Sequence, residues 1–366
     1  MKVLLLSDIN SEHTQKWALS LAASGIEIGI FSLNKSRTKW FENIERITIL
    51  NDGIYNVSTI SIFSKWKYIL QVSKVKSIIK QFQPDIVHSH YASSYGLLGA
   101  LSGFDNLVVS VWGTDVFNFP KKSTLHANLL SFILSKARTL TSTSFCMKEE
   151  LMKYTKKDIT VIHFGVNINV FTPKYYDLNA DSLTIGNIKA LEYDYGNHVL
   201  LQAFKIVNDK YPTKNLSLLF VGGGSQLEIL KKEASILNIS NKVHFAGKVP
   251  HSEVSQYHQK IDMFVSLTLV DESFGVSLIE AMSSGKAVIA SNTPGFAEVI
   301  DSSENGIIIE KNSVNEAVDA MSWLIENPQE MINKGLASRK RVEENYNWEM
   351  NLKQMIELYS NLNKTN

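Results

Sequence analysis

Short aliphatic runs alternate with segments of helical periodicity along the whole chain, and this alternation constrains the fold more than any other feature. Such runs are typical of parallel strands buried on both faces, and the segments between them are typical of helices that cover the sheet. In the first half we predict helices at 13–24 and 74–82 and strands at 2–9, 26–33, 85–90 and 107–113. The pattern predicts a doubly wound α/β fold.

The same alternation starts again after a polar, turn-rich segment at 166–182. Further strands are predicted at 182–188, 216–224, 242–247, 262–267, 286–291 and 305–310. A chain of 366 residues exceeds what one hydrophobic core usually supports. We therefore predict an N-terminal Rossmann-like domain at 1–172, a C-terminal Rossmann-like domain at 173–345, and a final helix at 346–366 that returns to the N-terminal domain. Ligands of such sheets bind at the carboxyl ends of the strands, so we expect a cleft between the two domains.

Composition indicates a folded protein of a reducing compartment. The chain has 37 basic and 36 acidic residues with 44% apolar content, which does not fit a disordered chain. A single cysteine, Cys146, excludes a disulfide framework and a cysteine-based metal site. The opening stretch 1–9 is too short for a signal peptide, and no run approaches the length of a membrane span. We therefore expect a cytoplasmic protein.

The near-neutral total charge hides a difference between the two halves. Residues 1–172 carry a net charge of +7 and the remainder a net charge of −6, which favours an anionic surface or acceptor near the first half. With few arginines and no nucleic-acid motif, no nucleic-acid partner is expected. Segment 61–82 interleaves lysines with aromatic and aliphatic residues. It fits either a helix packed on the sheet with its lysines outward or peripheral contact with the inner face of the cell membrane.

The stretch "DESFGVSLIEAMSSGKAVIA" at 271–290 places two carboxylates eight positions apart. Its periodicity puts Glu272 in a loop and Glu280 on the helix that follows. The start of that helix offers backbone N–H groups at Phe274, Gly275 and Val276. Together these donors and acceptors suit the hydroxyls of a sugar or the oxygens of a phosphate. The alternative is that both carboxylates are ordinary solvated surface groups.

Several stretches, in this order, resemble the family 4 retaining glycosyltransferases of the GT-B fold. They are "DIVHSHYASSYGLLGAL", "VSVWGTDV", "VIHFGVNINVFTP", "LLFVGGGSQLEIL", "VHFAGKVPHSEVSQYHQKIDMFVSL" and "ESFGVSLIEAMSSGKAVIASNTPG". The resemblance covers nearly the whole chain. It implies two Rossmann-like domains facing each other across a cleft, and transfer of a sugar from a nucleoside diphosphate sugar to an acceptor hydroxyl with retention. It also implies a glycan or lipid-linked acceptor in cell-surface polysaccharide or lipid-linked glycan synthesis, with no metal and no cofactor.

The resemblance also implies roles for residues of the second half. Glu272 and the backbone at 274–276 would hold the donor sugar, and Glu280 the nucleotide ribose. Gly223 and Val249 would flank the nucleotide. Lys189 stands where relatives have an arginine and Tyr195 where they have a lysine, and both belong to the predicted donor site. Lys189 would then supply most of the positive charge that the departing diphosphate requires, helped by the hydroxyl of Tyr195.

In the first half, candidate site residues follow predicted strands. His90 and Asp115 are candidates to orient the reacting groups and, with Lys189 and Glu272, form the predicted catalytic set. Trp112 stands where relatives often carry a histidine. The predicted acceptor side comprises His13, His90, Tyr91 and Trp112. A structural role stays open for His90 and Asp115, because a buried histidine and an aspartate that caps a loop are common.

Two other functions fit the same architecture. A nucleotide-sugar 2-epimerase shares the two domains but needs acid and base groups around the second carbon of the sugar. A non-catalytic nucleotide-sugar-binding protein would fit the departures at Trp112 and Tyr195. The paired glutamates around the "FG" turn favour the transferase.

Overall fold

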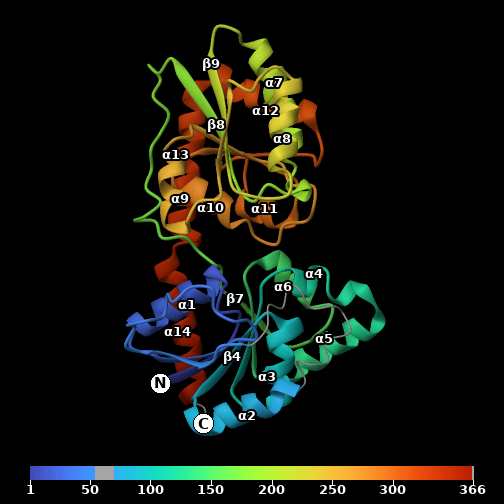
Figure 1. The fold of residues 1–366 in the computed structure, drawn as a ribbon, viewed down its shortest axis with the longest axis vertical. Coiled ribbons are helices and arrows are strands. Elements are labelled where there is room, and N and C mark those ends of the chain that lie inside the picture. Colours follow the sequence, from blue (N-terminus) through green and yellow to red (C-terminus); the bar gives the residue numbers. More distant parts are fainter. Residues whose placement is uncertain (54–69, 365–366) are drawn as a thin grey trace. The chain divides into compact units, whose positions relative to one another are not determined.

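The computed structural model describes residues 1–53 and 70–364, which divide into two compact units (Figure 1). The first unit joins residues 1–164 to the C-terminal segment that starts at Glu349. The second unit comprises Gly165–Trp348. Each unit is an α/β layer structure with its own sheet and its own hydrophobic core.

The first unit is built on a seven-stranded sheet of parallel strands in the order β3-β2-β1-β4-β5-β6-β7. Its strands are β1 (Lys2–Leu6), β2 (Glu27–Phe31), β3 (Ile47–Asn51), β4 (Ile86–His90), β5 (Leu107–Val111), β6 (Thr139–Ser142) and β7 (Ile159–Val161). Its helices are α1 (Glu12–Ala23), α2 (Val72–Phe82), η3 (Ala92–Gly96), α3 (Leu97–Ser102), α4 (Thr114–Phe117), η4 (Pro120–Lys122), α5 (Thr124–Lys136), α6 (Phe145–Leu151) and α14 (Trp348–Lys364).

Helices cover both faces of this sheet. Side chains of α2, α3, α5 and α6 share one core with alternate residues of the central strands, such as Leu4 and Val109. The opposite face meets α14, where the hydroxyl of Tyr359 lies 2.5 Å from Nδ1 of His88 on β4. Nε2 of His88 lies 2.6 Å from Oγ of Ser110, so both ring nitrogens have partners. This contact fixes the C-terminal helix in the first unit.

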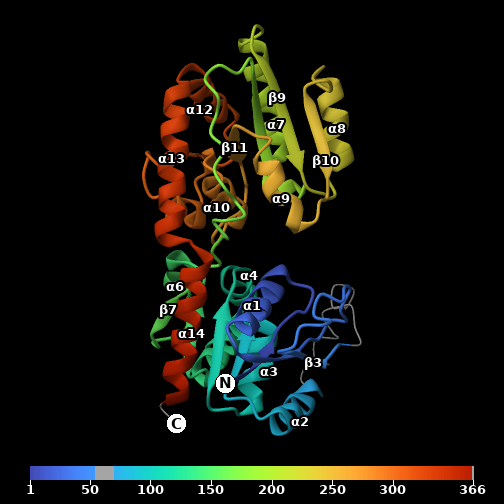
Figure 2. The same cartoon turned by 90° about the vertical axis from the view of Figure 1, so that its left-hand side faces the viewer.

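The second unit is built on a six-stranded parallel sheet in the order β10-β9-β8-β11-β12-β13. Its strands are β8 (Ser182–Ile188), β9 (Asn215–Val221), β10 (Val243–Gly247), β11 (Met263–Ser266), β12 (Ala287–Ser291) and β13 (Ile307–Ile309). Its helices are η5 (Tyr193–Tyr195), α7 (Asn197–Lys210), α8 (Leu227–Ile236), α9 (His251–His258), α10 (Val276–Ser283), α11 (Pro294–Val299), α12 (Val314–Glu326) and α13 (Pro328–Asn345). Helices α7, α8 and α12 share the main core on one face, and α9, α10 and α13 lie along the other (Figures 1 and 2).

The second unit begins at Gly165, eight residues before the predicted domain boundary. The segment after Gly165 is fastened to the second unit by hydrogen bonds. Arg339 of α13 donates to the carbonyls of Ile168 and Phe171 at 3.1 and 2.8 Å, and the hydroxyl of Ser283 also donates to Phe171 at 2.8 Å. The polar composition of this segment predicted a linker. Its backbone carbonyls accept hydrogen bonds from side chains that lie far along the sequence, and periodicity gives no signal for such bonds.

Every strand and helix predicted by periodicity is present, and three further strands were missed. β3 is partly exposed, β6 has the sequence Thr-Leu-Thr-Ser and β7 has only three residues, so none of the three stands out as an aliphatic run. Of the basic segment at 61–82, residues 61–69 lie outside the described residues. In α2 the apolar side chains of Val75, Ile78 and Phe82 are buried in the core, while the lysines point outward. Among the described helices, none has both the length and the apolar character of a membrane span.

Candidate active site

Loops at the carboxyl edge of the second sheet pack against each other through glycines. The backbone N–H of Gly222, after β9, donates to the carbonyl of Gly247 at 2.9 Å. Gly222 has φ +152°, and a Cβ there would lie 2.0 Å from the carbonyl oxygen of Lys189. A Cβ on Gly223 would lie 3.3 Å from Cβ of Lys248. The glycine run therefore lets the loops after β8, β9 and β10 approach closely, and it brings Gly223 near the loop that contains Val249.

Lys189 follows β8 and forms an ion pair with Glu272 in the loop before α10. The two side chains are only 14% and 18% exposed. The ammonium group also lies 4.1 Å from the centroid of the Tyr195 ring and 5.6 Å from that of Phe296. A cation shielded in this way is attracted by the ring faces as well as by the carboxylate. The site thus holds a positive charge in a partly dry position.

Tyr195 occupies the place where the sequence resemblance leads one to expect a lysine. Burial raises the pKa of its phenol, and the neighbouring carboxylates of Glu272, Asp194 and Glu192 raise it further. Tyr195 is therefore a neutral group at physiological pH. Its ring supports Lys189 instead of adding a second positive charge.

The start of α10 is shaped by a left-handed glycine. Gly275 has φ +103°, and a Cβ there would lie 2.6 Å from the ring of Phe296 on α11. The backbone N–H of Gly295 donates to the carbonyl of Glu272 at 2.9 Å, which joins the two loops. The N-cap residue of α10 is Gly275, which has no side chain to cap the helix. The turn therefore directs the positive end of the α10 dipole, with Val276 at its first position, toward the loop that carries Glu272.

Glu280 lies further along α10 and is buried, with a side chain that is 7% exposed. Nε2 of His251, at the start of α9, lies 3.0 Å from Oε1 of Glu280. Burial would raise the pKa of the Glu280 carboxyl, but the hydrogen bond with His251 and the nearby ring of His258 lower it to about 2. Glu280 is therefore an ionised acceptor at neutral pH.

His258, at the end of α9, is fully buried beside the same carboxylate. Its Nε2 lies 3.8 Å from Oε2 of Glu280, which is beyond hydrogen-bond distance. Burial lowers the pKa of His258 against the effect of the Glu280 carboxylate, and the ring packs against Phe171 and Phe264.

In the first unit, predicted residues gather at the carboxyl edge of the other sheet. His90 ends β4 and is buried, with Nδ1 3.0 Å from the hydroxyl of Ser7. Trp112 follows β5, and its ring centroid lies 4.5 Å from that of His90 and 5.7 Å from that of His13. The His13 ring stacks on Phe164 at 3.9 Å. These four rings form one aromatic cluster. Burial lowers the pKa of His90, and the neighbouring His88 and His13 lower it further.

Asp115 joins the loops at the carboxyl edge of the first sheet. It is fully buried, and its two oxygens accept hydrogen bonds from the backbone N–H groups of Ala92, Trp112 and Gly113 at 2.8, 3.1 and 2.8 Å. Burial raises its pKa against the effect of those bonds. The carboxylate of Asp115 therefore fixes the loops after β4 and β5. This geometry fits the structural role that the sequence left open beside a catalytic one.

Tyr91, next to His90, has a backbone φ of +77°, which is uncommon for a residue with a side chain. Its hydroxyl bonds to the hydroxyl of Thr114 at the start of α4. The loops after β4 and β5 are thus joined by both Tyr91 and Asp115. Of the predicted acceptor-side residues, His90, Tyr91 and Trp112 lie at this pair of loops, and His13 contacts Trp112 from α1.

Comparison with known families and structures accounts for both halves of the chain. A family model described as Glycosyl transferases group 1 matches residues 172–348, and one described as Glycosyl transferase 4-like matches residues 2–144. The chain belongs to the group 1 glycosyltransferases. An uncharacterized glycosyltransferase of Haemophilus influenzae is 27% identical over 318 residues, which cover 85% of each protein.

Solved structures place this glycosyltransferase in the GT-B fold. Sucrose-phosphate synthase from Thermosynechococcus elongatus is 20% identical, covers 100% of both chains and has a TM-score of 0.84. HepE of Anabaena in complex with UDP-glucose is 17% identical, covers 99% of this chain and 100% of its own, and has a TM-score of 0.76. The predicted fold, with two Rossmann-like domains, is confirmed.

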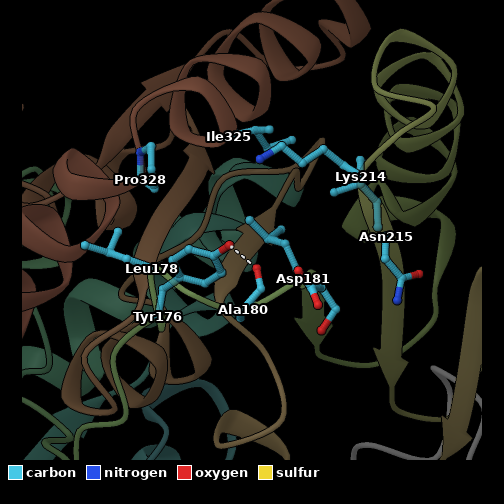
Figure 3. Close-up of a pocket in the computed structure, with 11 residues that line it drawn as sticks. Tyr176, Leu178, Ala180, Asp181, Lys214, Asn215, Ile325 and Pro328 are labelled. Atoms are coloured by element: carbon cyan, nitrogen blue, oxygen red, sulfur yellow. Dashed lines mark hydrogen bonds between the residues drawn. The ribbon is translucent and has the colours of Figure 1, made fainter.

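A small pocket lies at the amino-terminal edge of the second sheet, opposite the edge that carries Lys189 (Figure 3). Its lining includes Tyr176, Asp181, Lys214 and Asn215, and its volume is about 80 Å³. Ligand pockets usually measure several hundred Å³. The pocket is therefore smaller than a usual ligand site.

Sequence reasoning missed three residues near Lys189 and Glu280 in the second unit. His251 and His258 flank Glu280, and Phe296 packs over Gly275 and Lys189. His251 follows the end of β10 by only a few residues, so its position after a strand was a usable signal. Among the described residues, no group of three or more histidine, cysteine, aspartate or glutamate side chains is placed to hold a metal ion.

Proposed function

We propose that this glycosyltransferase transfers a sugar from a nucleoside diphosphate sugar to an acceptor hydroxyl with retention at the anomeric carbon. The observation that carries the proposal is the ion pair between Lys189 and Glu272 at the carboxyl edge of the second sheet. A carboxylate suited to sugar hydroxyls and a cation suited to phosphate oxygens lie in contact there. A donor that has a sugar joined to a diphosphate offers partners to both.

The donor would lie along this edge. Glu272 and the backbone at Phe274, Gly275 and Val276 would bind the hydroxyls of its sugar, and Glu280 would accept hydrogen bonds from the ribose. Gly223 and Val249 would contact the nucleotide. The complexes of Anabaena HepE with UDP and with UDP-glucose support a donor of this class. We propose that no metal ion takes part, because the positive end of the α10 dipole and Lys189 supply the charge.

In the reaction, the bond between the anomeric carbon and the β-phosphate oxygen breaks, and the acceptor oxygen forms its bond on the same face of the sugar. The proton of the acceptor hydroxyl passes to the departing phosphate oxygen. Negative charge gathers on the diphosphate as the bond breaks, and Lys189 can turn from Glu272 toward that charge. A cation already held in a partly dry site stabilises this charge more strongly than one in water.

The acceptor would contact the carboxyl edge of the first unit, where His13, Tyr91 and Trp112 lie. His90 and Asp115 would act as positioning residues, since both are buried and bonded to neighbouring groups. A glycan or lipid-linked acceptor, handled on the cytoplasmic side in polysaccharide or lipid-linked glycan synthesis, fits an aromatic surface of this kind.

The test is a thermal-shift screen of the full-length protein against UDP-, GDP-, ADP- and dTDP-sugars, followed by NMR of the reaction with the donor that binds. A bound donor raises the melting temperature by mass action. The proposal expects one donor to stabilise the protein and to give a product with the same anomeric configuration. Release of an isomerised donor without an acceptor would identify an epimerase, and stable binding with no transfer to any acceptor would identify a binding protein.

A further inference from the structure

Helix α5 of the first unit is apolar on two opposite faces. Leu130, Ile133 and Leu134 point into the core and are buried, and α5 packs beside α3 (Figure 1). On the opposite face, Leu125 is 75% exposed and Phe132 is 38% exposed. These two residues are seven positions apart, which places them on one side of the helix. Leu125 and Phe132 therefore leave an exposed apolar strip on the outer side of α5.

The charged residues of α5 and of the sequence next to it all have one sign. The sequence contains no aspartate or glutamate between Asp115 and Glu149. Lys121 and Lys122 stand just before α5, and Lys136 ends it with Nζ 5.7 Å from the centroid of the Phe132 ring. Lys121 meets a carboxylate from another element, Glu150 of α6 at 3.4 Å, and its side chain stays 57% exposed. The outer face of α5 therefore combines exposed apolar side chains with exposed lysines.

Helix α8 of the second unit has a similar set of exposed residues but a different balance of charge. It also exposes two apolar residues, Ile229 and Ile236, and two lysines, Lys231 and Lys232. Its own Glu228 and Glu233 offset those lysines, and Lys231 is paired with Glu228. An anionic surface would be attracted to α5 and not to α8.

We propose that the outer face of α5 docks on an anionic lipid bilayer. Leu125 and Phe132 would enter the boundary between head groups and acyl chains, and Lys121, Lys122 and Lys136 would contact the negative head groups. Lysines with aliphatic stems suit this boundary because the stem lies in the apolar layer while the ammonium stays in water. The surface differs from the basic segment at 61–82, because the apolar side chains of Val75, Ile78 and Phe82 in α2 are buried in the core. The proposal does not depend on which donor the enzyme uses.

The experiment is sedimentation of the full-length protein with vesicles of phosphatidylcholine alone or mixed with phosphatidylserine. The variants are Leu125→Ser with Phe132→Ser, and Lys121→Ser with Lys122→Ser. The matched controls on α8 are Ile229→Ser with Ile236→Ser, and Lys231→Ser with Lys232→Ser. All these side chains are at least partly exposed, and the melting temperature of each variant verifies that it folds.

We expect wild-type protein to bind the anionic vesicles, to bind neutral vesicles much more weakly, and to dissociate at high salt. Loss of the two lysines should weaken binding roughly 20- to 30-fold, at about fivefold per lysine. Loss of Leu125 and Phe132 should weaken it at least about tenfold. The α8 controls should bind as wild type does.

No binding of wild-type protein to anionic vesicles at low salt would overturn the proposal, as would an equal loss in the α8 controls. Light scattering of the free protein tests a second copy of this chain as the occupant. A dimer that the change of Leu125 and Phe132 to serine converts into a monomer would also overturn the lipid assignment.

Discussion

Lys189 forms an ion pair with Glu272, and its ammonium also lies 4.1 Å from the centroid of the Tyr195 ring. The Lys189 ammonium is therefore held by the carboxylate of Glu272, in the loop before α10, and by the ring of Tyr195, which follows Lys189 in sequence. In the proposed reaction, the carboxylate would turn to the sugar and the cation to the diphosphate. The ion pair keeps both groups at the edge where the donor would bind.

Replacing Lys189 with alanine should lower kcat about 100- to 1,000-fold, because the charge that develops on the diphosphate loses its nearest cation. Steady-state assays with the identified donor measure this effect. The matched control is Lys242→Ala, since Lys242 is partly exposed and bonds to Asn215 at the other edge of the sheet. Wild-type kcat in Lys189→Ala would remove Lys189 from the site.

Tyr195 should act through its ring and not through its hydroxyl. Tyr195→Phe keeps the face on which Lys189 rests, so kcat should stay close to that of wild type. Tyr195→Ala removes the ring, and kcat should fall about tenfold, in line with a partly desolvated cation–π contact. A large loss in Tyr195→Phe would instead show that the phenol bonds to the donor.

The carboxyl group of Glu280 should make the unfolding free energy of the second unit fall at acidic pH. Its pKa in the folded protein is about 2 and its ordinary value is 4.5, so the unfolded chain binds the proton first. The stabilisation is complete above about pH 5 and is lost as the pH falls toward 2. Between pH 6 and pH 3 this group should account for about 2 kcal/mol of lost unfolding free energy.

The measurement for Glu280 is urea denaturation at both pH values, followed by amide exchange in α10. Glu280→Gln should lose less stability than wild type over that interval, by about the same 2 kcal/mol. His251→Ala should reduce the difference as well, because it removes the hydrogen bond that keeps the carboxylate ionised. Equal acid sensitivity in wild type and Glu280→Gln would contradict the assignment.

The contact between His88 and Tyr359 should stabilise the C-terminal helix in the first unit. Tyr359→Phe leaves a buried ring nitrogen of His88 without its partner, which should cost about 1–3 kcal/mol. Amide exchange in α14 during urea titration measures the change. Tyr193→Phe is the matched control, because Tyr193 is 59% exposed. Unchanged protection of α14 in Tyr359→Phe would show that other contacts hold the helix.

Periodicity predicted the fold well because most buried parallel strands are short runs rich in aliphatic residues. β4, β5, β11 and β12 are buried along their whole length, and each was predicted from the sequence. The end of a strand also indicated His90 and Asp115, since the carboxyl ends of parallel strands share one edge. Lys189 and Trp112 were indicated by the resemblance to a family, so the fold follows from local patterns and one topological rule, and these two site residues do not.

The partners of the site residues did not follow from sequence. His251 meets Glu280 across 29 positions, and Phe296 meets Gly275 through a turn that only the packed structure defines. The three backbone groups that surround Asp115 depend on how the loops after β4 and β5 fold together. Such contacts join separate segments, so a single sequence contains no periodic signal for them.

Calorimetric titration of wild type, Glu280→Ala and Lys242→Ala with the nucleoside diphosphate of the identified donor tests the donor site most directly. The account predicts that Glu280→Ala weakens binding at least about tenfold, as expected when one charged hydrogen-bond acceptor is lost, while Lys242→Ala binds as wild type does. Equal affinity in wild type and Glu280→Ala would show that the nucleotide lies elsewhere, and would contradict the account.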